Sequence, residues 1–231
     1  MAYKRLDPLR SLFLLCDVQE KFRNVMPLFG NMVQNINKLL QVGRALDVPL
    51  IVTEQYPKGL GNTVKEISLN NALAVIPKTK FTMYVPEMHC FIEELVSKGP
   101  IEVIIFGLET HVCVLQSAMD FMENDYSVHV VADCCCSRLN QDRDVALNLL
   151  RQMGCYVQTS ESVIFNLIQD KTHPKFEAVK NAVNTSSADM ELSQCVERNL
   201  NLVDFEKKEN KEVVKNSSIP KTESKILKDE S

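Results

Sequence analysis

A cysteine occupies the point where a strand pattern gives way to a helix pattern. Ile101–Phe106 is a mostly apolar run typical of a buried strand, Gly107 supplies a tight turn, and a helical period begins near His111. This order predicts that Cys113 lies in the first turn of a helix. There the free backbone amides and the helix dipole favour a thiolate and can also hold an oxyanion. Such a cysteine fits a nucleophile, and the alternative is a buried structural thiol.

Two charged side chains stand at the predicted ends of other strands. Asp17 follows the apolar run Ser11–Cys16, and Lys78 follows the short run Ala72–Pro77. Ligands of a doubly wound sheet bind beyond the carboxyl ends of its strands, so the topology can bring both residues and Cys113 to one rim. A carboxylate can serve a thiol as base, and an ammonium holds that carboxylate and favours the thiolate. The alternatives are a helix or turn cap for Asp17 and a solvated surface position for Lys78.

The elements that would position these residues alternate between strands and helices. The predicted strands are Ser11–Cys16, Val48–Thr53, Ala72–Pro77, Ile101–Phe106, Ser127–Val131 and Cys155–Thr159. The predicted helices are Asn31–Asp47, Pro86–Lys98, His111–Glu123, Gln141–Met153, Glu161–Gln169 and Lys175–Val183. This alternation predicts an α/β fold, with three α/β/α layers around a mostly parallel six-stranded sheet. Glu54–Asn71 is rich in turn residues and is predicted to be a loop.

Length, charge and cysteine content indicate what kind of protein to expect. The chain has 231 residues, 45% hydrophobic and 24% charged, as expected of one sizeable soluble domain. Its net charge of −4 predicts neither a nucleic acid nor a membrane as partner, and no run reaches the roughly 18 apolar residues of a membrane span. The eight cysteines form no small disulfide framework and no signal peptide is evident, so we expect free thiols. The predicted location is the cytoplasm, with mitochondria and nucleus as alternatives.

The chain divides into one folded domain and a tail. Residues 8–185 carry the strand and helix patterns and are predicted to form the domain. Beyond about Ser186 the composition changes, and residues 204–231 are mostly Lys, Glu, Asn and Ser. Such a segment buries too little apolar area to offset the entropy lost on ordering. Residues 186–231 are therefore predicted to be a disordered, charged C-terminal tail, with a helix at Glu191–Leu202 as the alternative.

Three motifs in chain order resemble those of a known superfamily. They are Leu15–Phe22, Lys78–Met83 and Gly107–Val114, with the sequences LCDVQEKF, KTKFTM and GLETHVCV. Together they resemble the isochorismatase-like cysteine hydrolases, which include nicotinamidases, N-carbamoylsarcosine amidohydrolases and isochorismatases. Thr53–Gly61 and His129–Cys134 are similar to segments of the eukaryotic isochorismatase domain-containing proteins, especially the protein 2 group. The resemblance covers residues 8–185 and implies the isochorismatase-like form of a Rossmann-like fold.

The resemblance implies a role for each residue of the rim. Asp17 would be the proton shuttle, Lys78 the activating cation and Cys113 the nucleophile. It also implies a cis peptide bond between Leu108 and Glu109, with the backbone amides of Glu109 and Cys113 forming the oxyanion hole. The implied chemistry is attack on an amide-like carbonyl, loss of the amine, and hydrolysis of a thioester on the cysteine.

The lysine and the substrate pocket leave alternatives open. Lys80 competes with Lys78, which we prefer because Phe81 and Thr82 then match the aromatic and small hydroxyl residues of the family motif. The candidate pocket residues are Phe22, Tyr56, Phe81 and His111. Core packing is the alternative for the two phenylalanines, and a solvent-facing position is the alternative for the histidine.

The sequence predicts no metal and no cofactor. Metal-binding nicotinamidases carry an Asp-x-His motif after the second strand, where this chain has Thr53–Tyr56 without a histidine. The four histidines are scattered and show no ligand spacing. Cys134–Cys136 lacks the Cys-x-x-Cys spacing of a metal site and better fits a packed strand end.

These features predict a metal-free cysteine hydrolase. We expect it to cleave a small amide- or ureido-type C–N bond through Asp17, Lys78 and Cys113, with a thioester intermediate. Two alternatives stay open: an interaction protein that has the fold but lacks efficient turnover, and a vinyl-ether hydrolase that does not need the thiol. The expected partners are a small-molecule substrate and, by family analogy, further copies of the chain in a homo-oligomer.

Overall fold

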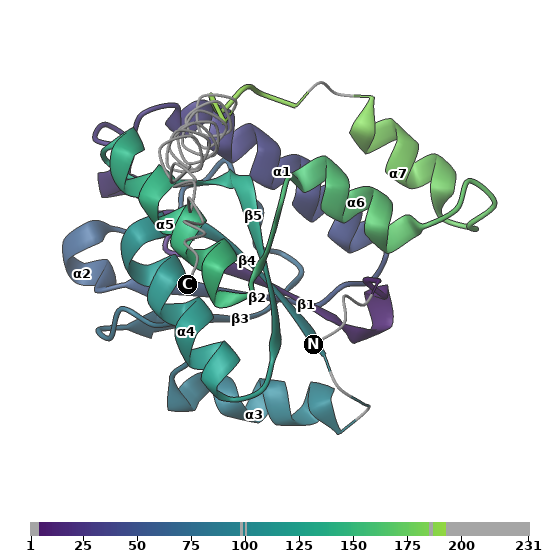
Figure 1. The fold of residues 1–231 in the computed structure, drawn as a ribbon, viewed down its shortest axis with the longest axis horizontal. Coiled ribbons are helices and arrows are strands. Elements are labelled where there is room, and N and C mark those ends of the chain that lie inside the picture. The colour runs from purple at the N-terminus through teal and green to yellow at the C-terminus, as the bar shows by residue number, and fades with distance from the viewer. Residues whose placement is uncertain (1–4, 98, 100, 185–186, 193–231) are drawn as a thin grey trace, which may run out of the picture. The chain divides into compact units, whose positions relative to one another are not determined.

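A parallel sheet of six strands, in the order β3-β2-β1-β4-β5-β6, forms the centre of the molecule (Figure 1). The computed structural model describes residues 5–97, 99, 101–184 and 187–192. The strands are β1 (Ser11–Cys16), β2 (Leu50–Gln55), β3 (Ala72–Lys78), β4 (Glu102–Leu108), β5 (Ser127–Cys136) and β6 (Tyr156–Gln158). Every neighbouring pair is parallel, so the predicted sheet is confirmed.

Helices cover both faces of the sheet (Figure 1). On one face lie α1 (Phe29–Ala45), α6 (Ser160–Ile168) and α7 (Phe176–Val183). On the other lie α3 (Pro86–Val96), α4 (Leu115–Glu123) and α5 (Asn140–Met153). This confirms the predicted three-layer α/β/α fold. No helix in the described part of the chain has both the length and the apolar character needed to cross a membrane.

The hydrophobic pattern of each strand explains its place in the sheet. Every residue of β1 and of β4 is buried, as expected of central parallel strands covered on both faces. Their phenylalanines, Phe13 and Phe106, pack edge to face with ring centroids 5.6 Å apart. In contrast, β3 lies at the edge and exposes Leu73 and Val75. The all-apolar strands therefore place the ends of β1 and β4 at the centre of the sheet.

One predicted strand is longer than its pattern indicated. The prediction ended this strand at Val131, whereas β5 continues to Cys136. Beside the bulge between Ile105 and Gly107 the register shifts, and Gly107 then pairs with Cys135. The three consecutive cysteines therefore form the buried end of a strand. A register shift of this kind cannot be predicted from a hydrophobic run.

The loop after β2 contains a short helix, α2 (Pro57–Leu60), which the prediction missed. Short helical turns also occur at η1 (Pro8–Arg10), η2 (Glu20–Phe22) and η3 (Thr110–Val114).

Near the C-terminal end of the described residues, Ala188 is held against α1. The Asn35 side chain donates to the carbonyl of Ala188 and accepts from its amide. Most of the predicted tail, residues 193–231, and with it most of the alternative helix, lies outside the described residues. The domain boundary stays a prediction.

Candidate active site

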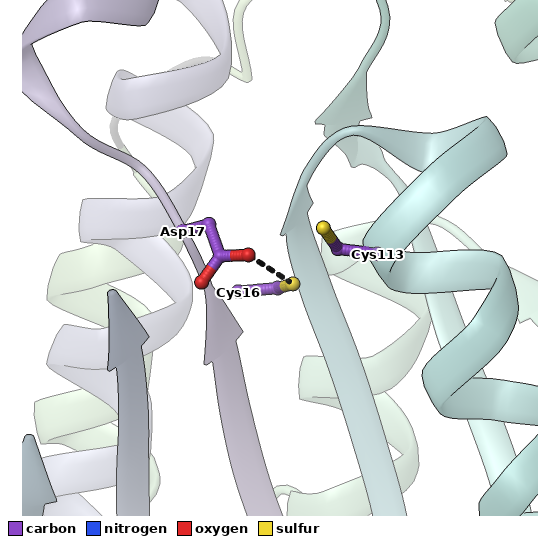
Figure 2. A group of neighbouring side chains, drawn as sticks. All are labelled: Cys16, Asp17 and Cys113. Atoms are coloured by element: carbon purple, nitrogen blue, oxygen red, sulfur yellow. Dashed lines mark hydrogen bonds between the residues drawn. The ribbon is translucent and has the colours of Figure 1, made fainter. Parts of the chain in front are cut away.

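The carboxyl end of the sheet brings the three predicted residues together. In the sheet, β1 lies between β2 and β4, and β3 lies beyond β2. Asp17 directly follows β1, Lys78 ends β3, and Cys113 lies in η3 between β4 and α4. Figure 2 shows Asp17, at the end of β1, facing Cys113 at the start of the helix. Residues 17, 78 and 113 thus meet at one rim although they are far apart in the chain.

Asp17 and Lys78 form a buried ion pair. Lys78 Nζ lies 2.7 Å from Asp17 Oδ2, and each side chain is only 1% exposed. Thr53 Oγ1 donates to the other carboxylate oxygen, Asp17 Oδ1, at 2.8 Å. A buried pair needs such additional hydrogen bonds to offset the loss of water around both charges. The carboxylate is therefore held in one orientation from two sides.

Further acceptors surround the ammonium group of Lys78. Gln55 Oε1 accepts from Nζ at 2.7 Å, and the backbone oxygens of Lys80 and Phe81 accept at 3.2 and 3.0 Å. The side chain of Lys80 is exposed. The geometry therefore places the ammonium of Lys78 beside Asp17, while Lys80 contributes its carbonyl.

Cys113 lies within η3, a π-helical turn that continues directly into α4. The prediction that it lies at the start of a helix is confirmed, and π-helical turns of this kind are frequent at functional sites. Its Sγ atom lies within 4.8 Å of a carboxylate oxygen of Asp17 and of a second thiol, Cys16 Sγ. The residue is 6% exposed, and its carbonyl accepts a hydrogen bond from Ser117 Oγ at 2.6 Å. The thiol and the carboxylate are thus close enough to exchange a proton after a small movement.

The surroundings shift the proton affinity of two groups. Burial lowers the pKa of Lys78, but the negative charge that the neighbouring thiols and carboxylate can carry outweighs burial and raises this pKa above its ordinary value. Burial, hydrogen bonding with Cys113 and the charge of Asp17 raise the pKa of Cys16 well above its ordinary value. At neutral pH the site therefore contains a charged lysine and a protonated Cys16.

The segment that would form the oxyanion hole has an unusual backbone. The peptide bond between Leu108 and Glu109 is cis. The Glu109 side chain is buried, and its Oε2 accepts hydrogen bonds from the Arg138 backbone amide at 3.1 Å and from Arg138 Nε at 3.3 Å. These bonds connect the end of β4 to the residues after β5. The role of the Glu109 and Cys113 amides stays a prediction.

A cavity of about 440 Å³ opens beside Lys78, between the ends of β2 and β3 and the start of α3. Its wall includes Tyr56, Lys58, Pro77, Lys80, Val85 and Glu87. Tyr56, one of the predicted pocket residues, is half exposed on this wall. Of the three candidate catalytic residues, only Lys78 borders this cavity; Asp17 and Cys113 are not among its lining residues.

The other three pocket candidates lie in different surroundings. Phe22 ends η2 and is partly buried, and Phe81 is 52% exposed while its backbone oxygen holds Lys78. His111 hydrogen-bonds Ser137 Oγ through Nδ1 at 2.9 Å, and its Nε2 lies 3.8 Å from Asp142 Oδ2. Contact of these three with a substrate stays a prediction.

Sequence reasoning missed three residues of the site. Thr53 and Gln55 lie near the end of β2, the strand between β1 and β3, and each contacts the buried ion pair. The rule that strand ends form the site would have indicated both, had the order of the strands been known. Cys16 was read as the last apolar residue of β1, and nothing in the sequence indicates that its thiol approaches Cys113.

Comparison with known proteins identifies relatives over most of the chain. The isochorismatase domain model matches residues 11–162. Isochorismatase domain-containing protein 1 of Danio rerio is 44% identical over 187 residues, which cover 81% of this chain and 65% of that protein. Isochorismatase domain-containing protein 2 of Bos taurus is 43% identical over 192 residues, which cover 83% of this chain and 91% of the relative. The chain thus spans about two thirds of the first relative's length and most of the second's.

Solved structures share the same fold. The structure of MAR1 ribonuclease from Caenorhabditis elegans superposes with a TM-score of 0.77 at 38% identity, over 82% of this chain and 97% of that chain. The YcaC protein of Escherichia coli, described as an octameric hydrolase of unknown specificity, superposes with a TM-score of 0.68 at 21% identity. That match covers 90% of this chain and 98% of YcaC, and it shows a common fold alone.

Proposed function

We propose that this chain, which belongs to the isochorismatase family, is a cysteine hydrolase that cleaves a small amide- or ureido-type C–N bond. One observation carries the proposal. A buried carboxylate, Asp17, is hydrogen-bonded to the ammonium of Lys78 and lies within 4.8 Å of the thiol of Cys113. A thiol with a positioned base beside it is the arrangement that nucleophilic catalysis requires.

The first half of the reaction forms a thioester. Asp17 accepts the thiol proton, and Cys113 Sγ attacks the substrate carbonyl carbon. The carbonyl oxygen takes up the negative charge, which the backbone amides of Glu109 and Cys113 would stabilise. As the C–N bond breaks, Asp17 returns the proton to the departing nitrogen. The products of this half are a free amine or ammonia and an acyl group on the cysteine.

The second half releases the acyl group. Asp17 accepts a proton from a water molecule as the water oxygen attacks the thioester carbonyl. Collapse of this intermediate breaks the C–S bond, and the proton returns to Cys113. The carboxylic or carbamic acid then leaves. Lys78 stays protonated throughout because the negative groups around it raise its pKa, and it keeps the Asp17 carboxylate oriented.

The cavity beside Lys78 has the size of a small-molecule pocket, although it does not reach Asp17 or Cys113. Its volume of about 440 Å³ lies within the range of small-molecule pockets, roughly 300–1,000 Å³. RNA is the competing substrate class, because the C. elegans relative bears the name ribonuclease. The net charge of −4 does not favour binding to a phosphate backbone, so we favour the small amide.

A panel of amides and ureides, scored by release of ammonia or amine, tests the proposal. Cys113→Ala should abolish turnover, and wild-type protein quenched during turnover should carry the acyl mass on the peptide that contains residue 113. Cys90→Ala is the matched control, because Cys90 is exposed on α3. Activity of Cys113→Ala on a vinyl ether, or thiol-independent cleavage of an RNA panel, would refute the mechanism.

We also propose that the protein assembles as a homo-oligomer. The E. coli YcaC protein, which has the same fold, is described as an octamer. Light scattering on the purified full chain should give a mass that is a multiple of 26.2 kDa, and a monomer mass across the concentration range would refute the proposal.

A further inference from the structure

A second thiol lies beside the proposed nucleophile. Cys16 Sγ, Cys113 Sγ and a carboxylate oxygen of Asp17 all lie within 4.8 Å of one another, and all three residues are buried (Figure 2). Cys16 Sγ also donates to Asp17 Oδ2 at 3.6 Å. The hydrolytic mechanism uses Asp17 and Cys113 and leaves Cys16 without a role.

We propose that Cys16, Asp17 and Cys113 bind one thiophilic divalent ion, Zn²⁺, and that this binding reversibly inhibits the enzyme. Two thiolates and a carboxylate are ligands that zinc prefers, and three protein ligands leave its fourth position open to water. In a tetrahedral site with Zn–S near 2.3 Å and Zn–O near 2.1 Å, neighbouring ligand atoms lie roughly 3.6–3.8 Å apart. Cys16 Sγ and Asp17 Oδ2, 3.6 Å apart, already have this spacing, and the remaining pairs must approach by at most about 1 Å, which side-chain rotation can provide.

The charges of the site balance around such an ion. Binding of the ion displaces the thiol protons of Cys16 and Cys113 to solvent. The resulting two thiolates and one carboxylate carry three negative charges, and Zn²⁺ with the Lys78 ammonium carries three positive charges. A neutral cluster avoids the large penalty of an uncompensated charge in a buried site. The same lysine that holds the carboxylate in the free enzyme therefore also neutralises the metal-bound form.

The lysine does not have to leave when the ion enters. Lys78 Nζ keeps Gln55 Oε1 and the backbone oxygens of Lys80 and Phe81 as acceptors. Each oxygen of the Asp17 carboxylate has two lone pairs, so the oxygens that accept from Thr53 and Lys78 can still coordinate a metal. The existing hydrogen bonds thus hold one ligand near its coordinating position.

Inhibition follows from the identity of the ligands. A zinc ion on the Cys113 thiolate blocks its attack on a carbonyl, and a zinc ion on Asp17 removes the base. This consequence rests on the proposed hydrolase function, whereas the binding of zinc does not. The two parts can therefore fail separately.

Titration of metal-free protein with Co²⁺ tests the binding without any substrate. Cobalt held by thiolates absorbs in the near ultraviolet through sulfur-to-metal charge transfer, so wild type and the control Cys90→Ala should both develop this band at one ion per chain. In Cys16→Ala and Cys113→Ala the band should weaken and the affinity for Zn²⁺ should fall by at least ~100-fold, more than the loss of an outer-shell partner. A band that is absent in wild type, or unchanged in Cys16→Ala, would overturn the proposal.

A second measurement uses only the wild-type protein, in case the alanine variants fold poorly. Zn²⁺ should protect Cys113 from iodoacetamide, EDTA should restore its labelling, and Mg²⁺ should have no effect. Labelling of Cys113 at the same rate with and without Zn²⁺ would overturn the binding proposal even if the enzyme is active. Protection of Cys113 in a protein that turns over no amide would support the metal site and refute the proposed function alone.

Discussion

Replacing Lys78 by methionine tests the electrostatic centre of the site. Methionine has a similar length but no charge, so the substitution removes the ammonium that lies 2.7 Å from Asp17 Oδ2 and leaves the volume nearly filled. The Asp17 side chain is 1% exposed and cannot gain water in place of the lysine. We expect the variant to be much less stable than wild type at neutral pH.

The expected magnitude follows from the burial of the pair. Removing one partner of a buried ion pair costs roughly 3–5 kcal/mol, because the remaining charge has no compensation. Asp17 keeps the hydrogen bond from Thr53 Oγ1, which places the loss near the lower end of that range. Since a domain of ordinary stability has only about 5–15 kcal/mol of unfolding free energy, the loss is easily measured.

Urea denaturation at pH 7.5, followed by circular dichroism, gives the unfolding free energies. The matched control is Lys80→Met, because Lys80 is exposed and its removal should change stability by less than about 0.5 kcal/mol. The double variant Lys78→Met/Asp17→Asn should recover at least half of the loss, since it also removes the unpaired charge. A Lys78→Met variant within 1 kcal/mol of wild type, or no recovery in the double variant, would refute the reasoning.

The stability difference between wild type and Lys78→Met should also change with pH in one direction. The pKa of Lys78 in the folded protein is raised by the negative groups around it, although burial opposes them. A raised pKa means that the lysine contributes its full stability below the unfolded pKa of about 10.4, and that this contribution is lost as pH rises through the folded pKa. From neutral pH up to about pH 10, the difference between wild type and Lys78→Met should therefore be constant, and it should shrink at higher pH.

Three further substitutions or probes test separate features of the site. Gly107→Ala should destabilise the fold by more than ~4 kcal/mol in urea denaturation, because Gly107 has a φ of 126° and an added Cβ would overlap the backbone oxygen of Cys16; near-native stability would contradict this packing. Thr53→Val removes the hydroxyl 2.8 Å from the site carboxylate and should cost about 1.5–3 kcal/mol of unfolding free energy, since the lost hydrogen bond reaches a charged group; an unchanged urea midpoint would contradict it. Iodoacetamide at pH 8 should label Cys113 and the exposed Cys90 but not Cys16, whose pKa is raised by burial, by hydrogen bonding with Cys113 and by the neighbouring carboxylate; peptide mass mapping that finds Cys16 labelled would contradict this environment.

The parts of the fold that depend on local hydrophobic runs could be predicted from the sequence. Ser11–Cys16 coincides with β1, and the helix predicted at Gln141–Met153 differs from α5 by one residue. The helix is long enough for its period to be clear, and the strand is a nearly continuous apolar run. The family assignment from three short motifs is confirmed by the isochorismatase domain model, which matches residues 11–162, and each motif lies at the end of a strand.

The parts that depend on pairing between distant segments could not be predicted. The continuation of β5 to Cys136 depends on the register shift opposite Gly107, which is set by packing of two strands. The contacts of Thr53 and Gln55 depend on the order of strands in the sheet. In each case the sequence shows the residue but not its neighbour.

The backbone at Asp17 explains how two consecutive residues can serve one site. In an extended strand, successive side chains point to opposite faces of the sheet, so Cys16 and Asp17 would be separated. Asp17 instead has a φ of 50°, in the left-handed region that aspartate tolerates better than most residues. The chain turns there, and the thiol of Cys16 and the carboxylate of Asp17 come to lie on the same side, near Cys113. A left-handed residue of this kind costs roughly 1–3 kcal/mol, and the buried pair with Lys78 fixes the strained turn in place.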